Sequence, residues 1–324
     1  MKLSVIIITK NEAANLGACL ASVAFADEII VLDSGSTDNT LDIARFHGAK
    51  VHSTTDWPGF GPQKNRALAL ATGDWVLSID ADERVTPELA GEIREILQAP
   101  VSDAYRIARL SRFGERWIRH SGWWPDYVVR LFKRGCAHFT SAKVHERLDI
   151  QGPVPALKAH FLHYPYANLE AFIAKINLYS SEAAAAMHAR GKRTSVLAAV
   201  GHATWTFLRH YVVRRGFLDG REGFILAVMA ATGSYYRYTK LLFLNRDAAR
   251  RDNVPDGNTL HENPPATLLP SDLPVEALQS GLPDSLLKGG QCVTTEQAGQ
   301  NGSAGQGALP GSAHTSNKRP EGAQ

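Results

Sequence analysis

The stretch that decides the fold is Gly73-Asp74-Trp75-Val76-Leu77-Ser78-Ile79-Asp80-Ala81-Asp82-Glu83. Residues 75–79 form a short apolar run after a Gly-Asp pair, and such a run predicts a buried strand. Its end carries two carboxylates, Asp80 and Asp82, separated by one residue. An open α/β sheet binds ligands at the carboxyl ends of its strands, and Mg²⁺ is often shared between carboxylates and substrate phosphates. The stretch therefore predicts a cation-assisted ligand site, with a solvated acidic turn as the structural alternative.

The segments around this strand alternate between strand and helix patterns. Apolar, β-branched runs predict further strands over residues 3–9, 28–32, 50–52, 104–110 and 127–133. Apolar residues at helical spacing predict helices over residues 12–22, 37–47 and 62–71, and Thr86-Pro87-Glu88 has the features of a helix start. This alternation predicts that the first hundred residues form a parallel α/β layer with right-handed crossovers.

Polar residues follow three of the predicted strands, where a purely structural loop would not need them. They are Thr9-Lys10-Asn11-Glu12, Asp33-Ser34-Gly35-Ser36-Thr37-Asp38 and Asp80-Ala81-Asp82. The carboxyl ends of parallel strands meet at one edge, so these residues predict a cleft suited to a nucleotide. The Gly-rich signatures of dinucleotide-binding folds and of phosphate loops do not occur in the sequence. Their absence argues against a dehydrogenase or a P-loop NTPase.

The charge is distributed unevenly along the chain of 324 residues, whose formal net charge is only +3. Residues 190–251 contain twelve Lys or Arg and three Asp or Glu, so this segment alone carries +9. We expect it to present a basic surface. Three scattered cysteines indicate neither a disulfide framework nor a metal site. The N-terminal apolar run is too short for a signal peptide, so we expect the catalytic part in the cytoplasm.

Several motifs occur in the order typical of one enzyme family. They are Ser4-Val5-Ile6-Ile7-Ile8-Thr9-Lys10-Asn11-Glu12, Val31-Leu32-Asp33-Ser34-Gly35-Ser36-Thr37-Asp38, Gln63-Lys64-Asn65-Arg66-Ala67 and Asp80-Ala81-Asp82. Together they resemble the family 2 inverting glycosyltransferases of the GT-A fold, a Rossmann-like and mostly parallel α/β sheet. With Trp123-Trp124-Pro125-Asp126, Arg130-Leu131-Phe132 and Val144-His145-Glu146, the sequence is most similar to lipopolysaccharide core β-1,4-glucosyltransferases. We expect a GT-A domain over residues 1–165, a helical basic region over 166–250 and a disordered tail over 251–324.

The resemblance implies a nucleotide-sugar donor, UDP-glucose, and a divalent cation, Mg²⁺ or Mn²⁺. The residues that it assigns to the donor are Thr9, Asn11, Glu12, Asp33, Ser34, Gly35, Lys64, Asn65, Asp80, Ala81 and Asp82. Asp80 and Asp82 are also the candidate metal ligands, with Asp82 in direct contact. Two alternatives stay open: Asp33 can simply close its own turn, and Lys64 can lie on a solvated helix face.

An inverting transfer needs a general base, which contributes about 10²–10⁴-fold to the rate. Asp126 is the first candidate and Glu146 the second, because Arg147 can engage Glu146 in an ion pair. The candidate acceptor-binding residues are Trp123, Trp124, Arg130 and His145. The two tryptophans can form a sugar platform or belong to the core. His160 and His163 resemble the late histidine that some GT-A enzymes offer to the metal, with a structural role as the alternative.

The C-terminal region predicts a helix over residues 169–187 and two apolar stretches over 196–213 and 224–244. Basic residues interrupt both stretches, so neither is expected to span a bilayer. Apolar faces with arginine, lysine and aromatic residues are typical of helices in the headgroup layer. A helical subdomain packed on the catalytic part is the alternative, and nucleic-acid binding is disfavoured.

These observations predict a peripheral enzyme on the cytoplasmic face of the inner membrane. It would transfer glucose from UDP-glucose to the heptose of the lipopolysaccharide inner core. Two alternatives remain: an acceptor such as a polyprenyl phosphate or another lipid-linked group, and a sugar nucleotidyltransferase.

Overall fold

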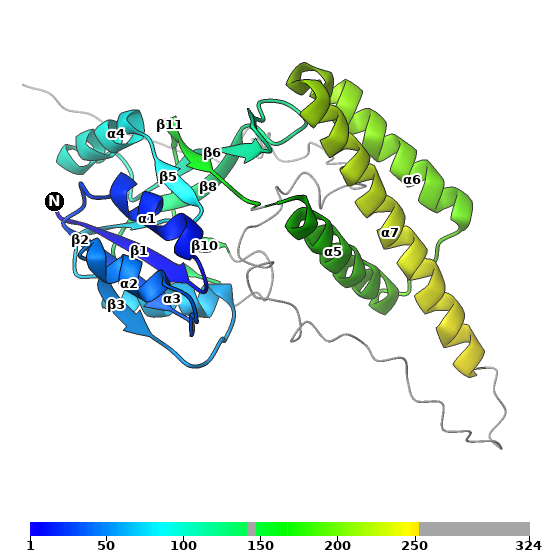
Figure 1. Ribbon diagram of the computed structural model, residues 1–324, viewed down its shortest axis with the longest axis horizontal. Helices are drawn as coiled ribbons and strands as arrows, with labels where there is room; N and C mark the ends of the chain where they lie inside the picture. The colour runs from blue at the N-terminus through cyan, green and yellow to red at the C-terminus, as the bar shows by residue number, and fades with distance from the viewer. Residues whose placement is uncertain (141–146, 167, 253–324) are drawn as a thin grey trace, which may run out of the picture. The chain divides into compact units, whose positions relative to one another are not determined.

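The computed structural model describes residues 1–140, 147–166 and 168–252 (Figure 1). Its first half alternates strands and helices in the order β1 (Leu3–Thr9), α1 (Ala13–Ser22), β2 (Glu28–Asp33), α2 (Thr40–Phe46), β3 (Lys50–Ser53), α3 (Phe60–Leu70) and β4 (Trp75–Ser78). These four strands are parallel and lie in the order β3-β2-β1-β4. The predicted parallel α/β layer is therefore confirmed.

The second half extends the same sheet with strands of mixed direction. It comprises β5 (Glu83–Val85), α4 (Pro87–Gln98), β6 (Ala104–Phe113), β7 (Arg116–Trp117), β8 (Asp126–Lys133), β9 (Ala137–Phe139), β10 (Leu148–Ile150) and β11 (Ala156–His163). Strands β9 and β10 pair only with each other, in a separate antiparallel two-stranded sheet. The full order is β3-β2-β1-β4-β8-β6-β11-β5, in which β8 runs antiparallel to β4 and β6. Strand β11 is parallel to β6 and antiparallel to β5. The sequence did not predict β5 or β11, and both carry residues of the site.

The sheet is buried on both faces, as the continuous apolar run of β1 requires. Successive residues of a strand point to opposite faces, and Val5 and Ile7 pack with Leu16 of α1 and Ile93 of α4 in one core cluster. Ile6 points the other way and packs with α3 in a second cluster. Helix α4 begins as predicted, because the Thr86 side chain accepts a hydrogen bond from the backbone N–H of Leu89.

The C-terminal region is helical, with α5 (Leu169–Ala189), α6 (Val196–Leu208), the π-helix η1 (Arg209–Val213), the 3₁₀ helix η2 (Gly216–Asp219) and α7 (Gly220–Asp252). Helix α7 packs against both α5 and α6 (Figure 1). Within the described part of the chain, none of the helices combines the length and the apolar character needed to cross a membrane. The predicted tail lies outside the described residues from residue 253 onward.

Candidate functional site

The loops after β1 and β2 are joined by hydrogen bonds centred on Asp33. The Asp33 Oδ2 atom accepts hydrogen bonds from the backbone N–H groups of Gly35 (2.9 Å) and Ser36 (2.8 Å). Its Oδ1 atom accepts from the Thr9 hydroxyl (3.2 Å) and from the Ser36 hydroxyl. The side chain is 1% exposed. Asp33 therefore closes its own turn, and this geometry favours the structural alternative over a direct nucleotide contact.

Two more residues predicted to bind the donor belong to this joined pair of loops. Asn11 has a positive φ of 54°, a conformation that asparagine tolerates better than most residues. Its backbone N–H donates to Ser36 Oγ (2.7 Å), and its side-chain Oδ1 accepts from the backbone N–H of Thr37 (2.8 Å). Ser34 Oγ accepts from the side-chain amide of Gln63 (3.0 Å). Thr9, Asn11, Ser34 and Gly35 thus meet at one edge of the sheet, and their contact with a nucleotide stays a prediction.

Lys64 and Asn65 face different parts of the protein although they are adjacent on α3. The Lys64 side chain is buried, and its Nζ lies 3.1 Å from Asp80 Oδ1, so the expected alternative of a solvated lysine is wrong. The Asn65 amide donates to the backbone carbonyl of Phe139 (2.8 Å) and accepts from the backbone N–H of Phe139 (2.8 Å). Both ends of the amide thus hold β9, and the contact of Asn65 with the donor stays a prediction.

A small hollow lies at the end of β4, and its lining includes Glu12, Asp80, Ala81 and Asp82. The Glu12 carboxylate accepts a hydrogen bond from the Asn15 amide (3.0 Å). Burial and the neighbouring negative charge of Asp82 raise the pKa of Glu12 from 4.5 to about 7. Three carboxylates crowded around one hollow repel one another, so the arrangement favours binding of a positive charge there.

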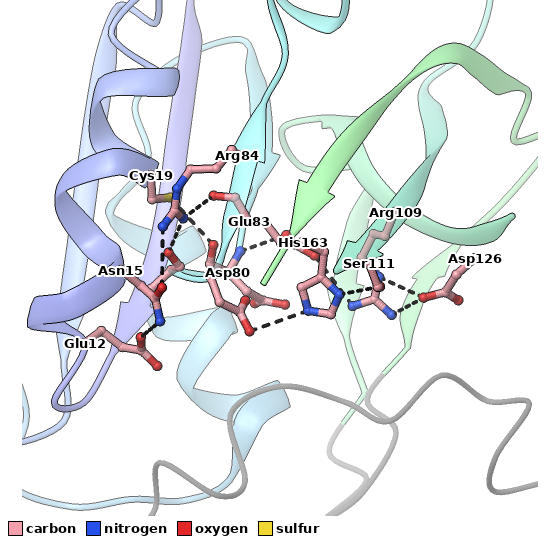
Figure 2. Close-up of polar contacts among 12 residues, drawn as sticks. Glu12, Asn15, Cys19, Asp80, Glu83, Arg84, Arg109, Ser111, Asp126 and His163 are labelled. Atoms are coloured by element: carbon pink, nitrogen blue, oxygen red, sulfur yellow. Dashed lines mark hydrogen bonds and ion pairs between the residues drawn. The ribbon is translucent and has the colours of Figure 1, made fainter. Parts of the chain in front are cut away.

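Asp82 is the residue at this hollow that best fits a divalent cation. Its Oδ1 atom is buried and has no hydrogen-bond partner among the described residues, whereas buried carboxylate oxygens normally have one. Its Oδ2 atom lies 3.5 Å from Nε2 of His163. His163 Nδ1 lies 2.9 Å from the Ser111 hydroxyl (Figure 2). If that nitrogen carries the proton, Nε2 keeps its lone pair on the side of Asp82, as a metal ligand requires.

The described residues contain no group of three or more histidine, cysteine, aspartate or glutamate side chains placed to hold a metal. Two protein ligands, Asp82 and His163, are enough for a cation that takes its remaining ligands from substrate phosphates and water. This is the usual situation of Mg²⁺. Asp80 fits less well, because Lys64 and Arg130 already contact its carboxylate. Burial raises the pKa of Asp80, but these two cations outweigh that effect and hold the pKa far below its usual range. Asp80 lines the same hollow as Asp82, and its role as a metal ligand stays a prediction.

A buried charge network continues from Asp80 towards the antiparallel half of the sheet. Arg130 contacts Asp80 and also donates to Glu83 Oε1 (3.0 Å). Arg109 Nη1 lies 3.5 Å from the same Glu83 oxygen, and Arg109 donates from Nε (2.9 Å) and Nη2 (2.5 Å) to Asp126 Oδ2 (Figure 2). Arg130 is 5% exposed. It therefore pairs with the interior acids Asp80 and Glu83, and its role in acceptor binding stays a prediction.

Asp126, the first candidate for the base, lies at the start of β8 with 18% of its side chain exposed. The ion pair with Arg109 orients its carboxylate. The register of the sheet creates this contact, because Arg109 on β6 lies directly opposite Asp126 on β8. The second candidate, Glu146, lies outside the described residues, as does the predicted acceptor residue His145.

The two adjacent tryptophans have different environments. Trp123 is fully buried and packs in a third core cluster with Ile118, Phe172 and Leu226. It therefore contributes to the core rather than to a sugar platform, which corrects its predicted acceptor role. Trp124 is partly exposed and makes an edge contact with His160 at 5.3 Å between ring centroids. Of the pair, only Trp124 is available to a sugar.

Sequence reasoning missed three charged residues of the site. Glu83 directly follows Asp82, so its position next to the carboxylate pair was the available signal. The sequence around Arg109 on β6 does not indicate a role in the site, because only the pairing of β6 with β8 brings this residue to Asp126. Lys175 of α5 is 1% exposed; burial lowers its pKa to about 7, while the charge of Asp82 acts in the opposite direction. Lys175 shows that the C-terminal region adds a cation near the acids.

Comparison with known proteins places this site in a family context. The model of the family described as Glycosyl transferase family 2 matches residues 4–148. An uncharacterized glycosyltransferase of Rickettsia typhi is 34% identical over 270 residues, which cover 78% of this chain and 91% of that protein. The lipopolysaccharide core biosynthesis glycosyltransferase LpsC of Rhizobium meliloti is 32% identical over 272 residues, which cover 79% of this chain and 97% of that protein.

Solved structures give weaker likenesses. Residues 1–349 of TarS from S. aureus are 17% identical with a TM-score of 0.41, covering 78% of this chain and 92% of that chain. Glucosyl-3-phosphoglycerate synthase of Mycobacterium tuberculosis is 31% identical with a TM-score of 0.30, covering 35% of this chain and 45% of that chain. Likenesses at these TM-scores carry no part of the family assignment.

Proposed function

The chain belongs to glycosyl transferase family 2, and we propose that it transfers glucose, with inversion, from UDP-glucose to a heptose of the lipopolysaccharide core. The observation that carries this proposal is the Oδ1 atom of Asp82 beside His163, which is buried and has no hydrogen-bond partner among residues 1–140, 147–166 and 168–252. It lies at the sheet edge where the strand-end loops meet. The similarity to LpsC supports the choice of acceptor.

In this proposal, Asp82 and His163 hold the divalent cation, Mg²⁺ or Mn²⁺, together with the donor diphosphate. When bound, the cation neutralises negative charge that develops on the leaving UDP. Asp80 has a different role, because it fixes Lys64, whose ammonium group lies 3.1 Å from Asp80 Oδ1 at the edge of the hollow. The strand-end loops around Asn11 and Asp33 supply a rigid wall for the nucleoside.

Asp126 acts as the general base. Its carboxylate accepts the proton of the acceptor hydroxyl while that oxygen attacks the anomeric carbon from the face opposite the diphosphate. The bond from the anomeric carbon to the phosphate oxygen breaks, and its electron pair leaves with UDP. Arg109 donates two hydrogen bonds to the same oxygen, Asp126 Oδ2, and thereby orients the carboxylate. Pre-orientation of a reacting group is a large part of catalysis.

The acceptor would approach past the partly exposed Trp124, whose ring can pack on the C–H face of a sugar. We place the enzyme at the cytoplasmic face of the inner membrane, because a lipid-linked core acceptor is made accessible there. A polyprenyl-phosphate acceptor is the second candidate within the family. A sugar nucleotidyltransferase is now disfavoured by the family assignment.

The test combines purified protein, UDP-glucose, Mg²⁺ and isolated core lipid, and it measures both released UDP and the mass of the glycolipid. Asp126→Asn should lower transfer by about 10²–10⁴-fold while the affinity for UDP-glucose, measured by calorimetry, stays within a few-fold. The matched control is Asp103→Asn, since Asp103 pairs with Lys133 at the other end of β8 on the surface. If Asp126→Asn retains activity within a few-fold, Asp126 is not the base, and Glu146→Gln becomes the next variant. A screen of UDP-glucose, UDP-galactose and UDP-N-acetylglucosamine identifies the donor.

A further inference from the structure

Helices α6 and α7 expose a set of large apolar side chains that the catalytic site does not use. We define the docking face by its members on α6–η1 and on α7, which are Leu197, Val200, Trp205, Leu208, Val212, Phe224, Ile225, Val228, Tyr235 and Phe243. The exposure reaches 84% for Leu197, 54% for Trp205 and 54% for Phe243. Soluble proteins rarely expose so many large apolar side chains together without a binding role.

The spacing of these residues places them on one side of each helix. Residues 197, 200, 205, 208 and 212 follow the helical repeat, and so do 224, 228 and 235. The opposite side of α6 is buried, with Ala199 and Thr206 facing inward. Ring contacts join the two helices, because Phe224 meets Phe207 at 5.8 Å and Tyr211 at 5.5 Å between centroids. The exposed apolar residues therefore lie on two helices that are in contact with each other.

Basic residues flank this surface at both ends of the helix pair. Lys192 and Arg193 precede α6 and are exposed, as are Arg246 and Arg250 in the last turns of α7. The side-chain amide of Asn245 donates to the Lys192 carbonyl (2.9 Å), which holds these two ends side by side. Exposed Arg215 and Arg221 lie at the other end, Arg215 in the segment that follows η1 and Arg221 in the first turn of α7.

Acidic residues are few in this region. Between residues 192 and 250, all of which the structure describes, the acids are Asp219, Glu222 and Asp247, and only Asp247, next to Arg246, is exposed. Asp219 is 2% exposed and accepts hydrogen bonds from the backbone N–H groups of Arg119 and His120. The Glu222 side chain is 12% exposed and is paired with Arg221. The surface therefore combines an apolar centre with a basic rim.

We propose that the docking face binds the surface of an anionic phospholipid bilayer, with its apolar residues inserted at the headgroup level and its basic rim on the lipid phosphates. This combination of an apolar face, aromatic residues and flanking arginines suits an interfacial helix pair. A second copy of the chain is disfavoured as the occupant, since a symmetric contact would bring two basic rims together. The proposal extends the proposed lipid-linked acceptor by naming the surface that meets the lipid.

The test is flotation of the full chain with vesicles of phosphatidylcholine alone, or of equal parts phosphatidylcholine and phosphatidylglycerol. The full chain should float with the anionic vesicles and not with the neutral ones. The triple variant Leu197→Ser, Trp205→Ser, Phe243→Ser should bind at least tenfold more weakly. The variant Lys192→Gln, Arg193→Gln should bind about 25-fold more weakly, because each of the two basic residues contributes roughly fivefold near an anionic surface.

The matched control is Phe46→Ser with Val101→Ser, because these side chains are 87% and 86% exposed and belong to the α/β layer. All variants should keep the wild-type circular dichroism melt, since each altered side chain is exposed. Equal flotation of the triple variant and the control would overturn the proposal, as would flotation of the full chain with neither vesicle. If the full chain sediments as a dimer and the triple variant as a monomer, the face binds a second copy of the chain instead. Flotation only after removal of residues 253–324 would assign it to that segment. The assay contains neither donor nor acceptor, so failure of docking is distinguishable from failure of glucosyl transfer.

Discussion

Replacing Glu83 by glutamine removes one negative charge from a buried network that is otherwise balanced. Glu83 is 0% exposed and accepts hydrogen bonds from Arg130 (3.0 Å) and from the backbone N–H of Asp80 (3.0 Å), with Arg109 at 3.5 Å. The side chains joined by these contacts carry three positive and three negative charges, on Lys64, Arg109, Arg130, Asp80, Glu83 and Asp126. Glutamine keeps the shape of the side chain and leaves one positive charge without compensation. Breaking a buried ion pair in this way costs about 3–5 kcal/mol.

The assay is equilibrium urea unfolding at pH 7, followed by circular dichroism. Glu83→Gln should lower the free energy of unfolding by about 3–5 kcal/mol, whereas Glu95→Gln on the exposed side of α4 should change it by less than about 0.5 kcal/mol. The double variant Glu83→Gln, Arg109→Gln restores the balance of charge inside the network. It should therefore cost less than the sum of the two single variants, by about 1–3 kcal/mol.

Two results would refute this reasoning. A loss below about 1 kcal/mol for Glu83→Gln would show that the network does not need the Glu83 charge. Strict additivity of the double variant would show that Glu83 and Arg109 do not interact. Because Arg109 orients Asp126, folded Glu83→Gln protein should also show a lower kcat with little change in the affinity for UDP, and a purely structural role would not produce that split.

Three further variants test other parts of the fold and site. Lysine, hydroxyl and backbone N–H partners lower the pKa of Glu28 from 4.5 to about 2 despite its burial, which corresponds to about 3 kcal/mol of stability. This stability is present above pH 4.5 and is lost as the pH falls towards 2, so urea titrations of Glu28→Gln should lack that pH dependence and Asp42→Asn on the surface should retain it. Asp82→Asn should weaken Mn²⁺-dependent UDP binding at least tenfold in calorimetry and leave metal-free binding unchanged; equal Mn²⁺-dependent affinity would remove Asp82 from the metal site. Asn65→Ala should cost about 1–3 kcal/mol, because the buried Phe139 backbone loses its partners, and a loss of UDP affinity without a loss of stability would contradict the assigned role.

The parallel half of the sheet could be predicted because its signals are local. The run over residues 3–9 is apolar without alternation, as a strand buried on both faces requires, and Thr86 with Pro87 marks a helix start whatever lies around it. The carboxyl ends of parallel strands necessarily share one edge, so the meeting of Thr9 with Asp33 followed from the chain order alone.

Two pairs of adjacent residues show what the local sequence pattern does not determine. Lys64 and Asn65 are adjacent, but one step along a helix rotates a side chain by about 100°, which turns the first towards Asp80 and the second towards β9. Trp123 and Trp124 are adjacent too, and only one of them reaches the core. The sequence predicted that both pairs belong to the site, but it could not show which member of each pair faces the site.

Contacts between distant strands could not be predicted, because they depend on the sheet register. Arg109 reaches Asp126 only because β6 pairs antiparallel with β8. His163 reaches Asp82 only because β11 enters between β6 and β5, and β5 is a strand of three residues. Short strands show little hydrophobic pattern in the sequence, and they form when adjacent strands of the sheet supply the hydrogen bonds. The sequence therefore offered both Asp82 and His163 as metal candidates, but it could not show that the two side chains meet.

The packing of the C-terminal helices determines how their role can be tested. Leu226 of α7 packs in one core cluster with Trp123 and with Phe172 of α5, and burying each such side chain contributes about 1.5–3 kcal/mol. A chain ending at residue 191 would lose Leu226 and leave Trp123 partly uncovered, close in sequence to Asp126. Such a truncation would disturb the site and the docking face at once, so lost membrane binding could not be separated from lost folding. Exposed residues such as Leu197 and Trp205 lack these core contacts, and substitution there separates the two effects.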